Sequence, residues 1–221
     1  DIDAVFVTHE HSDHVGGAAA VMSAFDVSAL SSSIEATHPL RASARAHRRC
    51  EAGQSWRWDG VTFEVLHPRA EDYARTDAQP NTMSCVLAIT DAQGRRVLLT
   101  GDLESEQEAR LVREQPGRLK SDVLLVPHHG SKTSSSPAFL DAVAPRAALV
   151  QVGYRNRYGH PAPEVAARYA ERSVGLINTV GCGAWSTSSD VAADPTGICE
   201  RQRSRRYWHH GLDVAPSPGI A

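Results

Sequence analysis

Short apolar runs alternate with polar, turn-forming stretches along most of the chain. Runs of β-branched and aliphatic residues predict buried strands, and strict alternation around Phe63 predicts a half-buried one. We expect strands at Ile2 to Val7, Val27 to Ser31, Val61 to Val65, Ser84 to Thr90, Arg95 to Thr100, Asp122 to Val126 and Ala147 to Val152. The fourth and fifth of these are expected to form a hairpin across Asp91 to Gly94.

Amphipathic or proline-initiated segments lie between these strands. We expect helices at Ala18 to Phe25, Pro39 to Arg48, Glu104 to Glu114, Pro137 to Val143 and Pro163 to Arg172. A closing hairpin is predicted at Leu176 to Thr187, followed from Ser188 by a polar, Arg-rich and poorly ordered tail. The pattern therefore predicts an α/β domain over residues 1–187 with a tail over 188–221, and ligands in such folds gather after strand ends.

Composition narrows the class of protein. The chain has 221 residues, 41% hydrophobic and 22% charged, as expected for one soluble globular domain. Its net charge of −3 excludes a domain that is basic overall, so any nucleic-acid surface must be local. No apolar run approaches the roughly 20 residues of a membrane span. The cysteines, Cys50, Cys85, Cys182 and Cys199, are scattered, and we expect no disulfide framework.

The first predicted strand leads directly into a cluster of metal-ligand side chains. His9, His11, Asp13 and His14 lie in one loop that Gly16 and Gly17 follow. Alternate spacing lets His9 and His11 meet one ion while Asp13 and His14 turn toward a second. Imidazole and carboxylate together suit zinc, manganese or iron better than magnesium or calcium. Because this buried strand and its cluster stand at the very start of the chain, we expect that upstream segments are missing.

Other candidate residues also follow predicted strands. Asp102 ends Leu99-Thr100-Gly101-Asp102, where it is either a helix N-cap or a carboxylate that bridges two ions. Beside the histidine loop, we favour the bridge. His128 and His129 follow one strand and His160 follows another, and Asn81 and Ser84 precede a strand. His38, His47 and His67 are expected to be surface or packing residues.

Two divalent ions, zinc or manganese, would lower the pKa of a shared water and stabilise charge on a phosphoryl or acyl centre. One residue of the His128 and His129 pair would protonate the leaving oxygen. Asp13 and Asn81 are counted with this pair as candidate catalytic residues.

The His-x-His-x-Asp-His loop resembles that of the metallo-β-lactamase superfamily. Four later blocks resemble its branch in ComEC-type DNA-internalisation competence proteins. They are Asn81 to Leu87, Leu98 to Asp102, Val126 to Ser131 and Asn156 to Pro161, and the end, Arg205 to His210, is similar to proteobacterial members.

This resemblance implies an αββα sandwich that lacks its first strands here. By the same analogy His9, His11, Asp13, His14, Asp102 and His160 match metal positions, with His128 near the scissile group. It also implies an inner-membrane protein whose channel region belongs to the same polypeptide and which works with competence DNA-receptor proteins. This portion would lie in the periplasm and degrade the DNA strand that is not transported.

One departure concerns the first ion. Many members carry a further metal-binding histidine before the bridging aspartate, where this chain offers Asn81 and Ser84. The first ion would then be held more weakly or completed by water. Ser131, Arg205 and Arg206 are the candidate DNA contacts, although the arginines equally suit a solvated tail.

Three functions follow from these patterns. The first is a metal-dependent DNA nuclease. The second is a hydrolase of a small ester, lactam or other phosphodiester, because the superfamily fold supports many chemistries. The third is a non-catalytic module that guides DNA.

Overall fold

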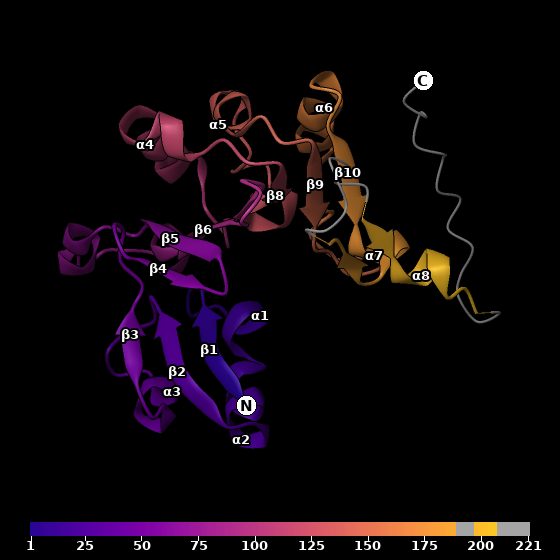
Figure 1. The fold of residues 1–221 in the computed structure, drawn as a ribbon. Coiled ribbons are helices and arrows are strands. Elements are labelled where there is room, and N and C mark those ends of the chain that lie inside the picture. Colours follow the sequence, from indigo (N-terminus) through magenta and orange to yellow (C-terminus); the bar gives the residue numbers. More distant parts are fainter. Residues whose placement is uncertain (189–196, 207–221) are drawn as a thin grey trace.

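Two β-sheets pack face to face, with helices on the outer side of each, in this computed structural model (Figure 1). The structure describes residues 1–188 and 197–206. The smaller sheet has the order β1-β2-β3 and the larger one β10-β9-β8-β7-β6-β5-β4. The predicted αββα sandwich is confirmed.

The smaller sheet is parallel throughout. It contains β1 (Ile2–Val7), β2 (Val27–Ser32) and β3 (His47–Arg49). The helices α1 (Ser12–Val15), α2 (Ala18–Ala24) and α3 (Pro39–Ser43) accompany it. The expected helix from Pro39 to Arg48 is wrong beyond Ser43, because the segment from His47 pairs with β2 instead.

The larger sheet is antiparallel at one side and parallel at the other. Its antiparallel strands are β4 (Ser55–Trp58), β5 (Val61–His67), β6 (Val86–Thr90) and β7 (Arg96–Leu99). β8 (Val123–Leu125), β9 (Ala147–Val150) and β10 (Gly175–Asn178) continue it in parallel. α4 (Ser105–Glu114), α5 (Pro137–Val143) and α6 (Pro163–Glu171) cover its outer face (Figure 1). Short 3-10 helices occupy Ala70–Ala74, Pro80–Met83, Pro116–Arg118 and Pro127–Gly130.

Alternation along the strands divides the core into three layers. In β6, Val86 and Ala88 pack toward the outer helices, whereas Leu87 and Ile89 face the other sheet. In β1, Val7 packs toward its own helices and Phe6 stacks on Trp56 between the sheets, with ring centroids 5.6 Å apart. Because successive strand residues point to opposite faces, each sheet contributes to two apolar layers.

The end of the chain differs from the prediction. β10 pairs in parallel with β9 and continues into α7 (Thr179–Cys182), so the expected closing hairpin is wrong. β11 (Trp185–Ser186) instead pairs with β12 (Ile198–Cys199), which precedes α8 (Glu200–Arg203). The expected lack of order is therefore wrong for this part, while 189–196 and 207–221 lie outside the described residues. The division of the chain at residue 187 stays a prediction.

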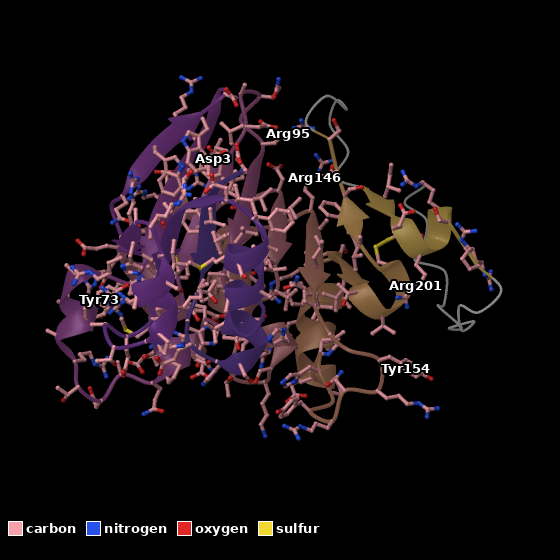
Figure 2. The ribbon with its side chains drawn as sticks, turned by 90° about the horizontal axis from the view of Figure 1, so that it is seen from below. Asp3, Tyr73, Arg95, Arg146, Tyr154 and Arg201 are labelled. Carbon is pink, nitrogen blue, oxygen red and sulfur yellow. A yellow bond between two sulfur atoms is a disulfide. The ribbon has the colours of Figure 1, made fainter. Side chains whose placement is uncertain are left out.

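Two disulfides contradict the expectation drawn from the scattered cysteines. Cys50 and Cys85 are 35 residues apart and join the segment after β3 to the segment before β6, which links the two sheets. Cys182 and Cys199 join α7 to β12 beside α8 (Figure 2). Within the described ranges, no helix has the length and apolar character needed to cross a membrane.

Candidate metal centre

The ends of β1, β7 and β8 bring together side chains that are far apart in the sequence. The histidine loop follows β1, Asp102 follows β7, and His128 and His129 follow β8. Asp102 is 3% exposed and His9 is 1% exposed, so both side chains lie below the surface. β7 and β8 are parallel neighbours, so their ends lie at one edge of the larger sheet, where α/β folds commonly place ligand sites.

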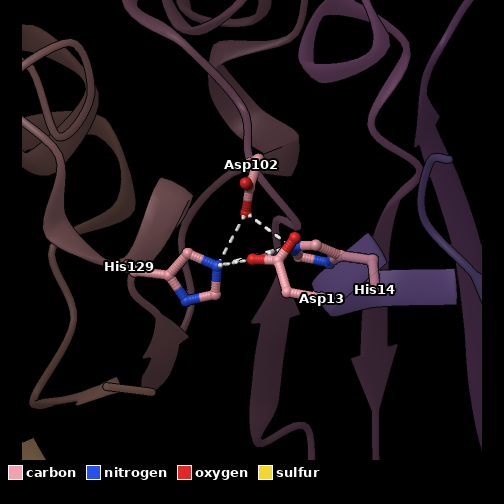
Figure 3. A group of neighbouring side chains, drawn as sticks. All are labelled: Asp13, His14, Asp102 and His129. Carbon is pink, nitrogen blue, oxygen red and sulfur yellow. Dashed lines mark hydrogen bonds and ion pairs between the residues drawn. The ribbon is translucent and has the colours of Figure 1, made fainter. Parts of the chain in front are cut away.

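One group of possible ligand atoms comes from Asp13, His14, Asp102 and His129, all within 4.8 Å of one another (Figure 3). The Nε2 atom of His14 lies 3.0 Å from Asp102 Oδ1 and 3.7 Å from Asp13 Oδ2. The Nε2 atom of His129 lies 3.3 Å from Asp13 Oδ2, 3.3 Å from His14 Nε2 and 3.5 Å from Asp102 Oδ1. Ligands in tetrahedral contact with zinc are about 3.4 Å apart, so this set fits such an ion.

A second group shares Asp102 with the first. His9, His11 and Asp102 offer ligand atoms within 4.8 Å of one another, with His9 Nε2 3.1 Å from His11 Nδ1 and 3.8 Å from Asp102 Oδ2. Asp102 thus presents Oδ1 to one group and Oδ2 to the other. This is the geometry expected of a carboxylate between two ions, and the set of donors suits zinc or manganese.

Hydrogen bonds behind the rings orient the ligand nitrogens. Thr8 Oγ1 lies 3.0 Å from His9 Nδ1 and 3.2 Å from His14 Nδ1. Because a hydroxyl oxygen has two lone pairs, both Nδ1–H groups can donate to it, which leaves both Nε2 atoms free to bind metal. His129 Nδ1 similarly donates to the carbonyl of Gln151 at 2.9 Å.

The electrostatics of the centre favour neutral His9 and ionised Asp102. Burial, with help from the nearby charge of His14, lowers the pKa of His9 to about 4. Burial is the largest single influence on His14 and Asp102, but their mutual hydrogen bond and the attraction of nearby opposite charges together outweigh it. That bond raises the pKa of His14 and lowers the pKa of Asp102. A neutral imidazole and a carboxylate are the forms that bind a cation.

Backbone conformation explains how adjacent histidines point in different directions. His128 and His129 have φ values of 48° and 53°, a left-handed conformation that costs a non-glycine residue roughly 1–2 kcal/mol. Gly130 continues the turn with φ of 78°, and a Cβ there would lie 2.6 Å from Pro161. Such strain at consecutive histidines indicates a functional turn.

His128 lies beside the metal groups and not within them. Its Nε2 atom is 3.7 Å from Asp102 Oδ2 and 3.4 Å from Asn81 Nδ2. Its Nδ1 atom faces Glu104 Oε1 at 3.3 Å, and Asn81 also donates to that oxygen at 3.2 Å. Glu104 therefore directs the Nε2 edge of His128 toward the centre. Glu104 was not predicted from the sequence, although its position two residues after Asp102 was a usable signal.

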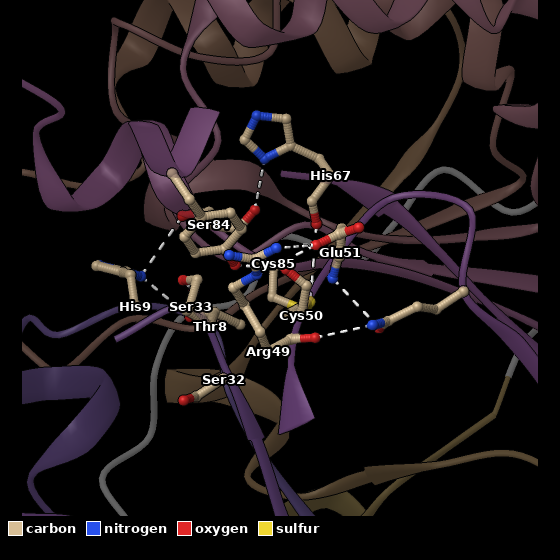
Figure 4. Close-up of a disulfide and its surroundings, with 12 residues drawn as sticks. Thr8, His9, Ser32, Ser33, Arg49, Cys50, Glu51, His67, Ser84 and Cys85 are labelled. Atoms are coloured by element: carbon tan, nitrogen blue, oxygen red, sulfur yellow. Dashed lines mark hydrogen bonds and ion pairs between the residues drawn. A yellow bond between two sulfur atoms is a disulfide. The ribbon is translucent and has the colours of Figure 1, made fainter. Parts of the chain in front are cut away.

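Ser84 supports the centre from behind (Figure 4). This fully buried hydroxyl accepts a hydrogen bond from the backbone of Asp102 at 3.0 Å and lies 3.5 Å from His9 Nδ1. The carbonyl of Ser84 accepts from His67 Nδ1 at 2.8 Å. His67 is 1% exposed, in agreement with the expected packing role.

The structure places several predicted residues differently. His129 joins a metal group, so the geometry favours a ligand over the proton donor that was one of the two options for this pair. His160 joins neither group formed by the described residues. Its backbone N–H donates to Asn156 Oδ1 at 2.9 Å and its carbonyl accepts from Asn156 Nδ2 at 2.8 Å, which fixes its backbone. The ring centroids of His160 and His128 are 6.2 Å apart.

The predicted DNA contacts are one buried serine close to His128 and two exposed arginines at the far end of the protein. Ser131 is 7% exposed and its hydroxyl pairs with that of Thr133 at 3.1 Å, which leaves little of it for a ligand. Arg205 and Arg206 are exposed, and they follow α8, which lies far from α1 and the histidine loop in Figure 1. A cavity of about 190 Å³ is lined by Thr8, His14, Asp102 and His129 among others.

The sequence is similar to known proteins over most of its length. The family model described as the metallo-beta-lactamase superfamily matches residues 1–154. The chain is 39% identical over 183 residues to "Competence protein ComA" of Neisseria gonorrhoeae, covering 83% of this chain and 25% of that protein. It is 33% identical over 184 residues to "Recombination protein 2" of Haemophilus influenzae, covering 82% of this chain and 22% of that one. The chain thus spans about a quarter of the length of these curated relatives.

Solved structures add evidence on the fold alone. CmlA, a diiron β-hydroxylase from Streptomyces venezuelae, aligns with a TM-score of 0.54 at 13% identity, over 80% of this chain and 43% of that one. The matched family model covers the histidine loop, Asp102 and His129, the residues that form the two ligand groups. The chain therefore belongs to the metallo-beta-lactamase superfamily.

Proposed function

We propose that this chain is a metal-dependent phosphodiesterase that cuts DNA during DNA uptake. The observation that carries the proposal is the pair of ligand groups that share Asp102, with the Glu104–His128 pair at their edge. Similarity to a competence protein supports DNA as the substrate. The strand degraded would be the one that is not transported.

The chemistry divides between the ions and the side chains. A pair of bound zinc or manganese ions supplies an activated water and neutralises charge that develops on a phosphate. His9, His11, Asp13, His14, Asp102 and His129 would hold them. His128, oriented by Glu104, would give a proton to the departing oxygen, and Asn81 would keep its ring in place.

The disulfides support a location outside the cytoplasm. Disulfides form and persist in oxidising compartments such as the periplasm. Within the described ranges no cysteine is free. We propose that this portion lies in the periplasm, beside a membrane channel region of the same polypeptide, and receives DNA with the help of competence DNA-receptor proteins.

The direct test is cleavage of labelled single-stranded and duplex DNA by the protein supplied with Mn²⁺ or Zn²⁺. Asp102→Ala should abolish cleavage, since it removes a ligand from both groups. Asp141→Ala is the matched control, because this exposed carboxylate pairs only with Arg172 among the described ion pairs. DNA binding without cleavage under every metal would favour a guiding module. Hydrolysis of small esters or lactams without DNA cleavage would favour the alternative hydrolase.

A further inference from the structure

The loop between β9 and α6 carries a group of exposed aromatic and cationic side chains. It contains Tyr154, Arg155, Arg157 and Tyr158, of which Tyr154 is 53% and Tyr158 is 66% exposed. Among the residues that the structure describes, the other large aromatic side chains with comparable exposure are Phe25 and Trp58. Figure 2 shows Tyr154 on a loop that extends from the edge of the protein.

Rings and guanidinium groups alternate within this loop. The guanidinium carbon of Arg157 lies 4.9 Å from the ring centroid of Tyr158, and Arg157 donates to the Tyr158 hydroxyl at 2.7 Å. The guanidinium carbon of Arg155 lies 5.2 Å from the ring centroid of Tyr154. Among the described residues, the contacts of Arg155 and Arg157 are with tyrosines and not with carboxylates, so both guanidinium groups can pair with an external anion.

The loop is held in shape from inside. Asn156 accepts from His160 N at 2.9 Å and donates to His160 O at 2.8 Å, so its side chain spans the loop. Gly159, with φ of 67°, supplies the turn that this closure needs. A loop fixed in this way presents Tyr158 at a defined position and would lose little conformational entropy on binding.

A series of rings leads from this surface to the metal centre. The Tyr158 ring stacks on that of His160 at 5.8 Å with an interplanar angle of 17°, and the His160 ring lies 6.2 Å from that of His128. His128 in turn lies 3.7 Å from Asp102. A strand whose base rests at Tyr158 would therefore have a phosphate within a few nucleotides of the two ligand groups.

We propose that Tyr158, with Arg157 and Arg155, is a stacking platform for unpaired bases of single-stranded DNA on their way to the metal centre. Aromatic rings and guanidinium planes stack on bases of any sequence, and free guanidinium groups pair with phosphates. The bases of a duplex are covered by their neighbours, so the platform selects unpaired strands. This inference rests on the proposed function, because it takes DNA as the substrate.

The test separates stacking from charge. Binding of a fluorescent single-stranded oligonucleotide is measured by anisotropy in EDTA, so that no cleavage occurs, and is compared with an abasic oligonucleotide of equal length and with a duplex. Tyr158→Ala should weaken binding of the base-bearing strand about tenfold, while Tyr158→Phe stays within about twofold of wild type. The abasic strand and the duplex should show no dependence on Tyr158. Arg157→Ala should weaken binding of both single strands, because both carry phosphates.

Phe25→Ala is the matched control. Phe25 is 56% exposed and follows α2, at the end of β1 opposite to the histidine loop, so its loss should leave binding unchanged. Equal binding by wild type and Tyr158→Ala, or no binding of single strands by wild type, would overturn the platform even if the protein cleaves DNA. Tyr158-dependent binding without cleavage under any metal would retain the platform and reject the nuclease.

Discussion

His14 and His129 are separated by 115 residues in sequence, yet their Nε2 atoms lie 3.3 Å apart. Both nitrogens also lie within 3.5 Å of Asp102 Oδ1. Two imidazole nitrogens at this distance, each with its other nitrogen engaged by a hydroxyl or a carbonyl, have lone pairs that converge on one point. The centre is thus built from both sheets, and its ligands can be tested one at a time.

Removal of His129 should cost the protein one ion. After zinc loading and gel filtration, we expect two ions per wild-type chain and one for His129→Ala, with affinity at the altered site reduced by at least about 100-fold. His160→Ala should keep both ions, because His160 lies outside both groups. Elemental analysis and zinc titration measure this directly. The reverse result, one ion lost with His160→Ala and none with His129→Ala, would show that His160 is a ligand and His129 is not, as the sequence suggested.

The role of His128 depends on the leaving group. His128→Ala should lower kcat on DNA by about 100-fold or more, because an alkoxide leaving group needs a proton. The loss should be much smaller with a p-nitrophenyl phosphodiester, whose leaving group is stable without one. Glu104→Gln should show the same pattern more weakly, with KM unchanged, since it affects only the orientation of the ring. An equal loss on both substrates would mean that His128 serves binding or folding instead.

The disulfide between Cys50 and Cys85 should affect both stability and metal affinity. Closing a loop of 35 residues stabilises the fold by about 3–4 kcal/mol in the chain-entropy model. The double alanine variant should lose this amount in urea unfolding, and it should bind zinc more weakly because Cys85 follows Ser84, whose hydroxyl holds Asp102. The Cys182 and Cys199 double variant is the control: it should lose about 3 kcal/mol but bind zinc normally. Equal zinc affinity in both variants would contradict this coupling.

His67 should make the fold sensitive to acid. Burial lowers its pKa from 6.5 to about 4, so between these values the unfolded chain binds a proton that the folded chain does not. Stability should therefore be complete above pH 6.5 and fall as the pH drops toward 4, by roughly 3 kcal/mol from this residue. His67→Gln should flatten the dependence of unfolding free energy on pH in this window, when both proteins are measured in EDTA. An unchanged slope would show that His67 does not supply it.

Local pattern was enough to predict most strands and the first ligands. β1, β2, β5 and the β6–β7 hairpin carry their own periodicity, and His9 to Asp13 lie next to one another in the chain, so no tertiary contact is needed to recognise them. β3 and β4 were missed because both are short and mostly exposed. β3 has three residues, two of them exposed, and depends on its pairing with β2, and β4 has four residues and pairs with β5. Short strands of this kind are stabilised by their partners and not by their own sequence.

The roles of His129 and His160 could not be read from sequence for a different reason. Whether His128 or His129 joins a ligand group depends on a left-handed turn at both residues, a conformation that their sequence does not favour. The sequence placed His160 just after a strand, but β9 ends at Val150 and a loop separates the two; Asn156 holds the backbone of His160 at the far end of this loop. The disulfide between Cys50 and Cys85 likewise depends on how the two sheets pack, which is a non-local property.

Because the ligand groups draw side chains from both sheets, the ions would also act on folding. His9, His11 and His14 follow the small sheet, whereas Asp102 and His129 follow the large one. Bound ions would thus hold the two sheets together, and metal binding would stabilise the folded chain against unfolding. A chain that meets no metal would be the less stable and more readily degraded form, so metal supply would set how much of the protein persists as well as how active it is.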